Sequence, residues 1–250
     1  MDDLTYTLRQ LCQRNRDGSY TTQADRMRSL ALAARQLREA GFRQMKVLAE
    51  DDDPQRACRP FDRNRKGLTI GEASGILVFE EEGRARRRGA AIRARFLGYG
   101  ITSDAHHMTQ PEPSGEAGAR TIRACLRSAR LDPSDVDYVN AHGTATVQND
   151  PAETLSIKLA LGERARKICV SSNKSMLGHC LCSAGAIEAV ATVRTIETGI
   201  VPPTIHYVEP DPDCDLDVVP NTAREHPVRV ALSNSFAFGG NSTVVAFGRA

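Results

Sequence analysis

The chain has 250 residues, of which 40% are hydrophobic and 26% are charged, a composition typical of a globular protein and not of a disordered one. Thirty-three basic and 31 acidic residues leave a net charge of +2, too balanced to favour nucleic acid or a membrane surface as a partner of the whole chain. No run of 18 apolar residues lacks a charge, and Asp2 and Asp3 stand where a secretory signal has basic residues. We therefore expect a cytoplasmic protein without a membrane span.

The first 45 residues differ from the rest in charge, with eight arginines against five acidic residues. Thr22 and Asp25 are typical of a helix start, and apolar residues then recur at helical spacing until Gly41. The stretch LTYTLRQLCQRNRDGSYTTQADR is similar to the opening of the helical domain of mobile-element integrases, and a solvated arginine-rich leader is the alternative. Residues 1–45 are expected to form a basic helical leader of unrelated origin.

A break at residues 51–54 (Asp-Asp-Asp-Pro) separates this leader from a stretch in which apolar and polar runs alternate. Residues 76–79 (Ile-Leu-Val-Phe) predict a buried strand, and residues 91–99 predict a second one. The charged run at 84–88 lies between them and predicts a hairpin tip.

Helices and strands then alternate to the end of the chain. A helix is expected over 114–130. A second begins with Asp150 as its N-cap, followed by Pro151, and ends at Gly162. A third spans 183–198. The expected strands are residues 136–140, 168–170, 228–236 and 243–247. This alternation predicts an α/β sheet.

The third of these helices is unusual because Glu188 is its only charged residue between Ser183 and Val193. A helix that is apolar nearly all round is typically buried between layers. Since an isolated buried carboxylate is costly, Glu188 must be paired or hydrogen-bonded.

The seven cysteines are odd in number and scattered, a distribution typical of free thiols in a reducing compartment. They are Cys12, Cys58, Cys125, Cys169, Cys180, Cys182 and Cys214. Cys180 and Cys182 form a C-x-C pair, but the sequence has no second pair at zinc-site spacing. We therefore expect structural thiols and no metal.

Four polar clusters follow expected strands or begin turns, where open α/β sheets bind ligands. They are residues 140–146 (NAHGTAT), residues 173–179 (NKSMLGH), Asp104 with His106, and residues 233–240 (SNSFAFGG). His142 and His179 each follow an expected strand and precede an expected helix, and Lys174 stands five residues before His179. A single such histidine is more often a core or capping residue, but two in equivalent positions indicate a site.

From residue 59 to the C-terminus, the chain resembles the β-ketoacyl-acyl carrier protein synthases, the condensing enzymes of fatty-acid and polyketide synthesis. The motifs that match in order and spacing are RPFDRNRKG, GEASG, VNAHGTAT, SSNKSMLGH, AGAIE, PPTI and SNSFAFGGNS. The resemblance implies an α/β, thiolase-like layered fold whose C-terminal half, residues 113–250, is essentially complete. Residues 46–112 would be a remnant of an N-terminal half that is mostly missing. This remnant would contain the closing strands of that half.

The reaction that the resemblance implies is the decarboxylative condensation of an acyl thioester with malonyl-acyl carrier protein, catalysed by an acyltransferase. His142 and His179 match the two histidines that donate hydrogen bonds to a thioester oxygen or shuttle a proton. Lys174 matches the lysine that orders the site electrostatically. Glu188 matches the glutamate that hydrogen-bonds near that lysine.

Further matches concern the substrate. Thr144 and Thr146 correspond to threonines that hydrogen-bond the pantetheine arm, and Phe238 to the phenylalanine that gates the nucleophile. Gly239 and Gly240 follow it in a turn that must change its backbone angles. The implied partner is acyl carrier protein, whose phosphopantetheine arm carries the substrate, so no cofactor held by this chain is expected.

The nucleophile is the main departure from the family, whose cysteine lies in a small-residue turn upstream of the RPFD motif. In this sequence that region is replaced. Cys12 lies in a polar helical pattern and Cys58 in a loop, so neither is expected to be the nucleophile. Ala237 and Cys182 stand where the family has glycine and are expected to narrow the pocket. Turnover by the chain alone should be impaired.

Three functions therefore remain open. The first is a condensing acyltransferase that is completed by an N-terminal ketosynthase half from another chain or acts as a homo-oligomer. The second is an inactive fusion fragment, and the third an interaction or DNA-binding protein led by the basic N-terminal helix. A metal hydrolase built on His142, His179 and Asp150 lacks any supporting spacing.

The helix over 183–198 is expected to leave one apolar face without its family partner, which favours association.

Overall fold

The computed structural model describes residues 41–42, 45, 47–51 and 53–250. The chain divides into two compact units, Met1–Lys46 and Val47–Ala250. Apart from Gly41, Phe42 and Met45, the expected basic leader lies outside the described residues, and so does Cys12.

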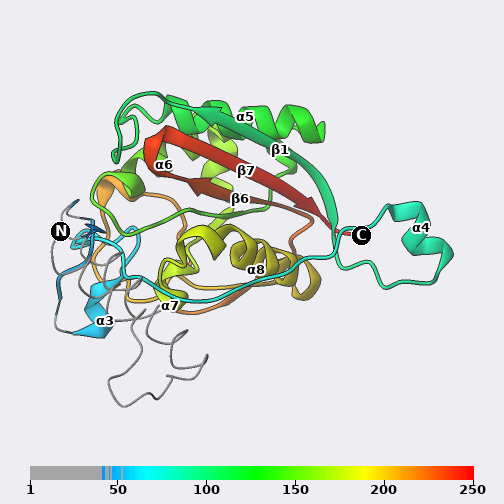
Figure 1. The fold of residues 1–250 in the computed structure, drawn as a ribbon, viewed down its shortest axis with the longest axis horizontal. Coiled ribbons are helices and arrows are strands. Elements are labelled where there is room, and N and C mark those ends of the chain that lie inside the picture. The colour runs from blue at the N-terminus through cyan, green and yellow to red at the C-terminus, as the bar shows by residue number, and fades with distance from the viewer. Residues whose placement is uncertain (1–40, 43–44, 46, 52) are drawn as a thin grey trace, which may run out of the picture. The chain divides into compact units, whose positions relative to one another are not determined.

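The Val47–Ala250 unit is built on a mixed five-stranded sheet with the order β1-β7-β6-β2-β3 (Figure 1). The strands are β1 (Arg95–Ser103), β2 (Tyr138–Asn140), β3 (Cys169–Ser171), β6 (Val230–Phe236) and β7 (Asn241–Gly248). Strands β1, β7 and β6 are antiparallel, whereas β6, β2 and β3 run parallel. The carboxyl ends of the three parallel strands therefore lie side by side, which is where open α/β sheets place their ligands.

Helices cover both faces of the sheet, so the predicted α/β class is confirmed (Figure 1). On one face, α5 (Glu116–Ala129) packs over β1 and β7 and against α6 (Asn149–Leu161). On the other face, α8 (Ala184–Thr198) packs over β6 and ends at Gly199, whose left-handed φ of 69° suits glycine. None of the helices within the described residues is long and apolar enough to cross a bilayer.

Shorter elements complete the unit. They are the helices α3 (Pro54–Ala57), α4 (Glu82–Arg87) and α7 (Lys174–Leu177), and a small antiparallel sheet of β4 (Ile200–Val201) and β5 (Arg224–Glu225).

Apolar side chains fill the space on each side of the main sheet. Ile122 of α5 and Ile157 of α6 belong to one core cluster, and Ile196 of α8 belongs to a second one on the other face. Full burial of a side chain of this size stabilises the fold by about 1.5–3 kcal/mol. Tyr138 is fully buried in the second cluster, where its phenol shares a 2.9 Å hydrogen bond with the hydroxyl of Ser171.

The prediction that Asp150 caps α6 is wrong, because the helix begins at Asn149 with Gln148 as the N-cap. The Asp150 carboxylate has other partners: it accepts the backbone N–H of Phe61 at 2.8 Å and the side-chain amide of Asn149 at 3.1 Å. It thereby fixes the first turn of α6 to the RPFD segment. The helix ends before Gly162, as predicted.

Burial of Asp150 should make the stability of the fold depend on pH. Desolvation raises the pKa of this carboxyl from 3.8 to about 6, although its hydrogen bonds with Phe61 and Asn149 oppose the shift. The folded chain therefore binds this proton more tightly than the unfolded chain, and the free energy of unfolding should fall by about 2 kcal/mol as the pH rises from 4 to 6. Urea unfolding at four pH values measures this. Asp150→Asn should flatten that part of the profile, and identical profiles for the two proteins would contradict the assignment.

The prediction of a buried strand over residues 76–79 is wrong. These residues are extended, but no strand within the described residues pairs with them, and the side chains of Ile76 and Val78 are 88% and 90% exposed. An apolar run is typical of a central strand, but a strand forms only where a neighbouring strand offers hydrogen bonds. The second expected strand does form, as β1, although it begins at Arg95 and runs on to Ser103.

The charged run between these segments forms the helix α4 instead of a hairpin tip. The carboxylate of Glu81 accepts the backbone N–H groups of Gly83 at 2.8 Å and Arg84 at 2.6 Å, which caps the helix. Arg86 then pairs with Glu82 one turn earlier, at 2.7 Å. Capping and i,i+4 pairing favour a helix. The hairpin prediction rested on the alternation of apolar and charged runs, which contains no information on capping or ion pairs.

Helix α8 is buried along one face only, so the prediction that layers enclose it is correct only for the face that meets the sheet. Ala189 and Thr192 are buried on that face, whereas Arg194 is exposed and Ile187 is half-buried. The extended segment at Gly75 lies against α8, since a Cβ on Gly75 would come within 3.1 Å of the Ala186 backbone.

Candidate active site

The parallel strands β2, β3 and β6 bring three of the four polar clusters to one edge of the sheet. His142 follows β2, Lys174 begins α7 just after β3, and Asn234 lies near the end of β6. His179 follows α7 and is fixed by its backbone, which donates to the carbonyl of Thr69 at 2.6 Å and accepts from Gly71 at 3.1 Å. Residues far apart in the sequence therefore form one site.

The two predicted histidines lie together, with ring centroids 5.4 Å apart and ring planes at 84°. Burial lowers the pKa of His142 well below its usual value, and the positive charge of Lys174 lowers it further. The pKa of His179 falls to about 3 for the same two reasons. Both imidazoles are therefore neutral at physiological pH.

The hydrogen bonds of His179 fix its tautomer. Its Nδ1 accepts the backbone N–H of Leu181 at 3.1 Å, so the ring proton of the neutral imidazole lies on Nε2. The Nδ1 of His142 is buried without a partner among the described residues. A neutral imidazole with a free N–H group is a hydrogen-bond donor for an oxygen that gains negative charge.

Lys174 and Glu188 form a buried ion pair, with side chains only 2% and 4% exposed. The ammonium of Lys174 donates to Glu188 Oε1 and, at 2.6 Å, to the carbonyl of His142. Desolvation raises the pKa of Glu188, and Lys174 opposes that rise. The pairing of Glu188 that its place in an apolar helix predicts is confirmed.

Glu153 is a site residue that the sequence analysis missed. Its carboxylate accepts the backbone N–H groups of His142 and Gly143, both at 2.8 Å, and the side-chain amide of Asn234 at 3.0 Å. It thereby fixes the turn that carries His142. The available signal is its position on the buried stripe of α6, four residues before Ile157 and seven before Ala160.

The turn that carries His142 requires glycine at position 143. Its φ is 39°, and a Cβ would lie 2.5 Å from the Cβ of Ser172. The hydroxyl of Ser172 donates to the Gly143 carbonyl at 2.7 Å, so the segments after β2 and β3 are joined directly.

The two predicted threonines lie on the same turn, with hydroxyls 2.9 Å apart. Thr144 is buried, whereas Thr146 is half-buried and accepts the backbone N–H of Asn149 at 3.3 Å. The structure therefore brings both hydroxyls together beside the histidine turn.

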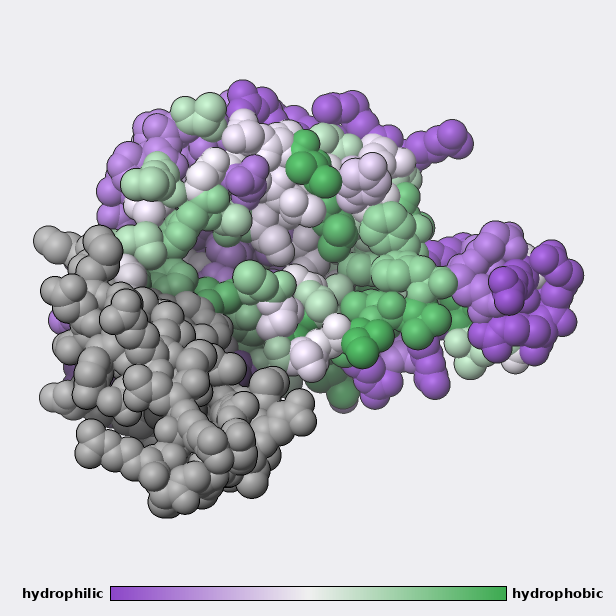
Figure 2. Space-filling view, in the orientation of Figure 1, coloured by the Kyte–Doolittle hydropathy of each residue, from purple (hydrophilic) through white to green (hydrophobic). Residues whose placement is uncertain are grey.

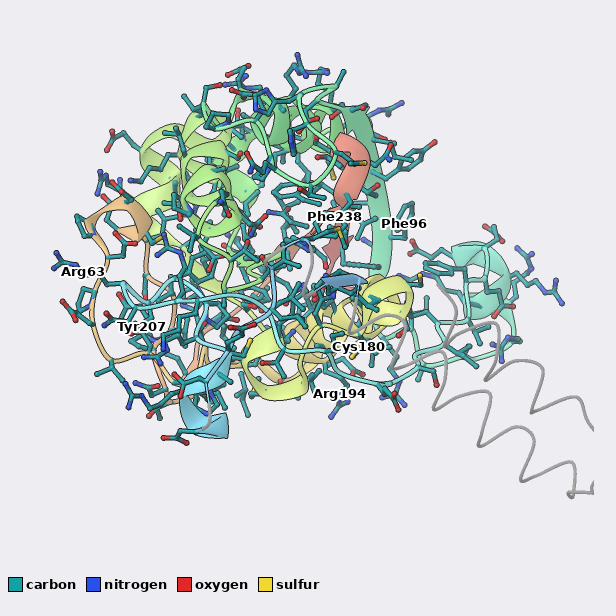
Figure 3. All side chains as sticks on the ribbon, turned by 60° about the vertical axis from the view of Figure 1, so that its left-hand side comes forward. Arg63, Phe96, Cys180, Arg194, Tyr207 and Phe238 are labelled. Atoms are coloured by element: carbon teal, nitrogen blue, oxygen red, sulfur yellow. The ribbon has the colours of Figure 1, made fainter. Side chains whose placement is uncertain are left out.

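Phe238, Gly239 and Gly240 form the turn between β6 and β7, and Phe238 is partly exposed there (Figure 3). Gly239 and Gly240 have φ of 78° and 75°, and a Cβ on Gly240 would collide with the Asp104 carboxylate. Asp104 donates its backbone N–H to Gly240 at 3.0 Å. The Asp104–His106 cluster thus contacts the glycine turn, and its described hydrogen bonds do not reach the two imidazoles.

A small pocket adjoins the ion pair. It is lined by Asn173, Lys174, Leu177, Gly178, Cys180, Ala184, Ile187 and Glu188. Cys180 lies between α7 and α8 (Figure 3). One carboxylate oxygen of Glu188, Oε2, is buried without a hydrogen-bond partner among the described residues.

The thiols near this site are not activated. Burial raises the pKa of Cys58 to about 11, and its thiol donates to the carbonyl of Lys174 at 3.4 Å. Burial also raises the pKa of Cys180, and the nearby Glu188 carboxylate adds to the rise. A protonated thiol is a weak nucleophile, so neither residue is suited to attack a thioester.

Asp150 does not join the imidazoles, since its carboxylate is bound to Phe61 and Asn149. Across the described part of the chain, no group of three or more His, Cys, Asp or Glu side chains is arranged to hold a metal ion. The hydrolase alternative therefore gains no support from the geometry.

The unit thus combines a mixed sheet covered by helices with two neutral imidazoles and a buried lysine at the strand ends. Residues 93–208 match the family model of the beta-ketoacyl synthase C-terminal domain. Residues 93–208 therefore form a β-ketoacyl synthase C-terminal domain.

Curated relatives agree with this family. The chain is 48% identical over 208 residues to a 3-oxoacyl-[acyl-carrier-protein] synthase 2 of Staphylococcus aureus (strain COL), covering 83% of this chain and 50% of the relative. The corresponding protein of Synechocystis sp. is 51% identical over 209 residues, with 83% and 50% covered. The chain therefore spans about half the length of these relatives.

Solved structures show the same fold. A ketosynthase in complex with its type II polyketide acyl-carrier protein superposes with a TM-score of 0.84 and 42% identity, over 86% of this chain and 53% of that one. A beta-ketoacyl synthase from Burkholderia phymatum gives 0.78 and 38%, over 84% and 51%.

Proposed function

We propose that this chain supplies the decarboxylating half of a β-ketoacyl-acyl carrier protein synthase, an acyltransferase of fatty-acid or polyketide synthesis. The observation that carries the proposal is the pair of neutral imidazoles, 5.4 Å apart, beside the buried ion pair of Lys174 and Glu188. The nucleophilic thiol comes from a segment equivalent to the half of the relatives that this chain does not span.

The first chemical step is the decarboxylation of a malonyl thioester. The bond between the carboxylate carbon and the methylene carbon breaks, CO₂ leaves, and the electron pair forms an enolate with its negative charge on the thioester oxygen. The Nε2–H group of His179 donates a hydrogen bond to that oxygen, and His142 provides a second neutral donor beside it. Such donors stabilise charge most where water is excluded, as in this buried site.

In the second step, the enolate carbon attacks the acyl thioester on the nucleophilic thiol. The carbon–sulfur bond breaks, the thiolate leaves and takes a proton, and the product is a 3-oxoacyl thioester on the carrier protein. Lys174 does not react in either step. Its charge adds to burial in keeping both imidazoles unprotonated, and its bond to the His142 carbonyl positions that residue.

Acyl carrier protein is the proposed partner, and its phosphopantetheine arm brings the substrate. Thr144 and Thr146 would hydrogen-bond this arm, and Phe238 with Gly239 and Gly240 would form the gate to the thiol. The support is the place of the two threonines on the turn that carries His142, and the place of Phe238 just after Phe236, whose ring lies 6.0 Å from that of His142. The free thiols of the described residues accord with a cytoplasmic location.

The raised pKa values of Cys58 and Cys180 argue against a complete enzyme. We expect the chain alone to form no acyl-enzyme. The test is the release of CO₂ from malonyl-acyl carrier protein by the purified chain. We expect release above the background of the carrier protein alone. Background release only would favour the alternative of an inactive fragment.

A further inference from the structure

Arg65 is a buried arginine that the proposed reaction does not use. The arginines of α4 lie at the surface, at the hydrophilic right-hand end of the unit in Figure 2. The side chain of Arg65, in contrast, is only 6% exposed, and it forms an ion pair with the carboxylate of Asp211, which is 11% exposed. A buried charge is costly unless it is paired and hydrogen-bonded, so the contacts of this guanidinium indicate its role.

Three backbone carbonyls accept hydrogen bonds from the guanidinium of Arg65. Its Nη1 donates to the carbonyl of Asp62, three residues earlier, at 3.0 Å. The other two carbonyls belong to the segment 144–147, which we call the threonine turn: Nε donates to Thr146 and Nη2 to Val147, both at 3.3 Å. A planar guanidinium carries its donors in a fixed fork and can therefore bind two adjacent carbonyls at once. Arg65 thereby fixes the end of the threonine turn.

The threonine turn needs a restraint because its backbone is strained at Ala145. The φ of Ala145 is 64°, in the left-handed region that residues with a Cβ rarely adopt. In this conformation the hydroxyls of Thr144 and Thr146 lie 2.9 Å apart. The Thr146 hydroxyl already accepts the backbone N–H of Asn149 at 3.3 Å, so its own proton is free for Thr144 or for a substrate.

Different side chains fix the histidine end of the same loop. Glu153 accepts the backbone N–H groups of His142 and Gly143, both at 2.8 Å, and Lys174 donates to the His142 carbonyl at 2.6 Å. The described contacts of Arg65 lie at the other end of the loop, so the imidazole and the threonines have separate anchors. A change at Arg65 should therefore disturb the threonines and leave His142 in place.

We propose that Arg65 is a positioning residue for substrate binding. It holds Thr144 and Thr146 in the geometry in which their hydroxyls hydrogen-bond the amide groups of the phosphopantetheine arm. The inference rests on the proposed function, which gives these two threonines the arm as their ligand. Arg65 acts through the backbone of the threonine turn and takes no part in the chemistry at the imidazoles. Its loss should weaken binding of the arm without slowing the chemical step.

The first test is the binding of S-acetyl-pantetheine, an arm without a malonyl group, measured by NMR titration of the full chain. Arg65→Lys keeps the charge that pairs with Asp211 but lacks the fork that binds two carbonyls. The dissociation constant should rise about tenfold, the equivalent of one or two lost hydrogen bonds. The matched control is Arg63→Lys, at a side chain that is 63% exposed and points away from the unit (Figure 3), and it should change the constant less than about twofold.

The kinetics of CO₂ release separate positioning from a general effect on the fold. With malonyl-acyl carrier protein, Arg65→Lys should raise KM about tenfold and leave kcat within about twofold. With the malonyl thioester of methanethiol, which has no arm, kcat/KM should stay within about twofold. A residue that only stabilises the fold would lower the rate with both substrates equally. Arg65→Gln combined with Asp211→Asn removes both charges of the buried pair and should behave as Arg65→Lys does.

The inference is overturned if the unchanged chain does not bind S-acetyl-pantetheine, or if Arg65→Lys and Arg63→Lys affect binding equally. It is also overturned if both Arg65 variants lower kcat/KM for the armless thioester as much as for malonyl-acyl carrier protein. Loss of the folded circular dichroism spectrum in both variants overturns it as well, because a role in folding then accounts for the residue. Binding of the arm that depends on Arg65, without any CO₂ release, would instead contradict only the proposed function.

Discussion

Replacement of Lys174 by methionine is expected to lower the free energy of unfolding by roughly 3–5 kcal/mol, the usual cost of removing one partner from a buried ion pair. Lys174→Met keeps the length of the side chain but leaves Glu188, 4% exposed, without its cation. It also frees the His142 carbonyl that Lys174 binds at 2.6 Å. Urea unfolding monitored by circular dichroism measures the loss.

Two further variants separate charge from packing. The double variant Lys174→Met with Glu188→Leu should recover most of the loss, because it removes both charges. Lys158→Met breaks a partly exposed pair with Asp215 and should cost less than about 1 kcal/mol. Equal losses for Lys174→Met and Lys158→Met would show that the buried pair contributes no more to the free energy of unfolding than the partly exposed pair.

Replacement of His179 by alanine is expected to lower the rate of CO₂ release from malonyl-acyl carrier protein by roughly 10²–10³-fold, the usual cost of one oxyanion donor. His179→Asn should retain more activity than His179→Ala, because its amide still donates a hydrogen bond. His226→Ala, at a histidine outside the site, is the control and should leave the rate unchanged.

The pH dependence gives an independent measure of this role. The pKa of His179 is about 3, and that of His142 is also lowered, so both rings stay neutral from pH 6 to pH 8. The rate of CO₂ release should therefore be flat over that range. A rate that follows a group of pKa near 6.5 would show that a protonated imidazole acts instead.

Most of the α/β framework could be predicted from the sequence, because helix and strand patterns after residue 113 are local and agree with the packing. Helices α5 and α8 and strands β6 and β7 occur close to their expected bounds. The failure over residues 76–79 has a physical cause: the side-chain pattern of a strand is local, but its hydrogen bonds depend on a neighbour that these residues lack in the described unit.

The candidate site could be predicted in part. His142, His179, Lys174 and Glu188 stand out because polar residues at strand ends and a lone charge in an apolar helix are visible in the sequence. The structure adds the edge-to-face contact between the two histidines and the ion pair between Lys174 and Glu188. Glu153 was missed because its role depends on backbone N–H groups, which leave no mark on residue type.

The most direct measurement of the central claim places the purified chain with acyl- and malonyl-acyl carrier protein and follows CO₂ release and intact mass together. The claim is that this chain holds a working imidazole pair, whereas the nearby thiols of Cys58 and Cys180 are protonated and cannot carry the acyl group. It predicts CO₂ release with no added acyl mass on any of the seven cysteines. An acyl adduct on this chain that malonyl-acyl carrier protein then extends would contradict it.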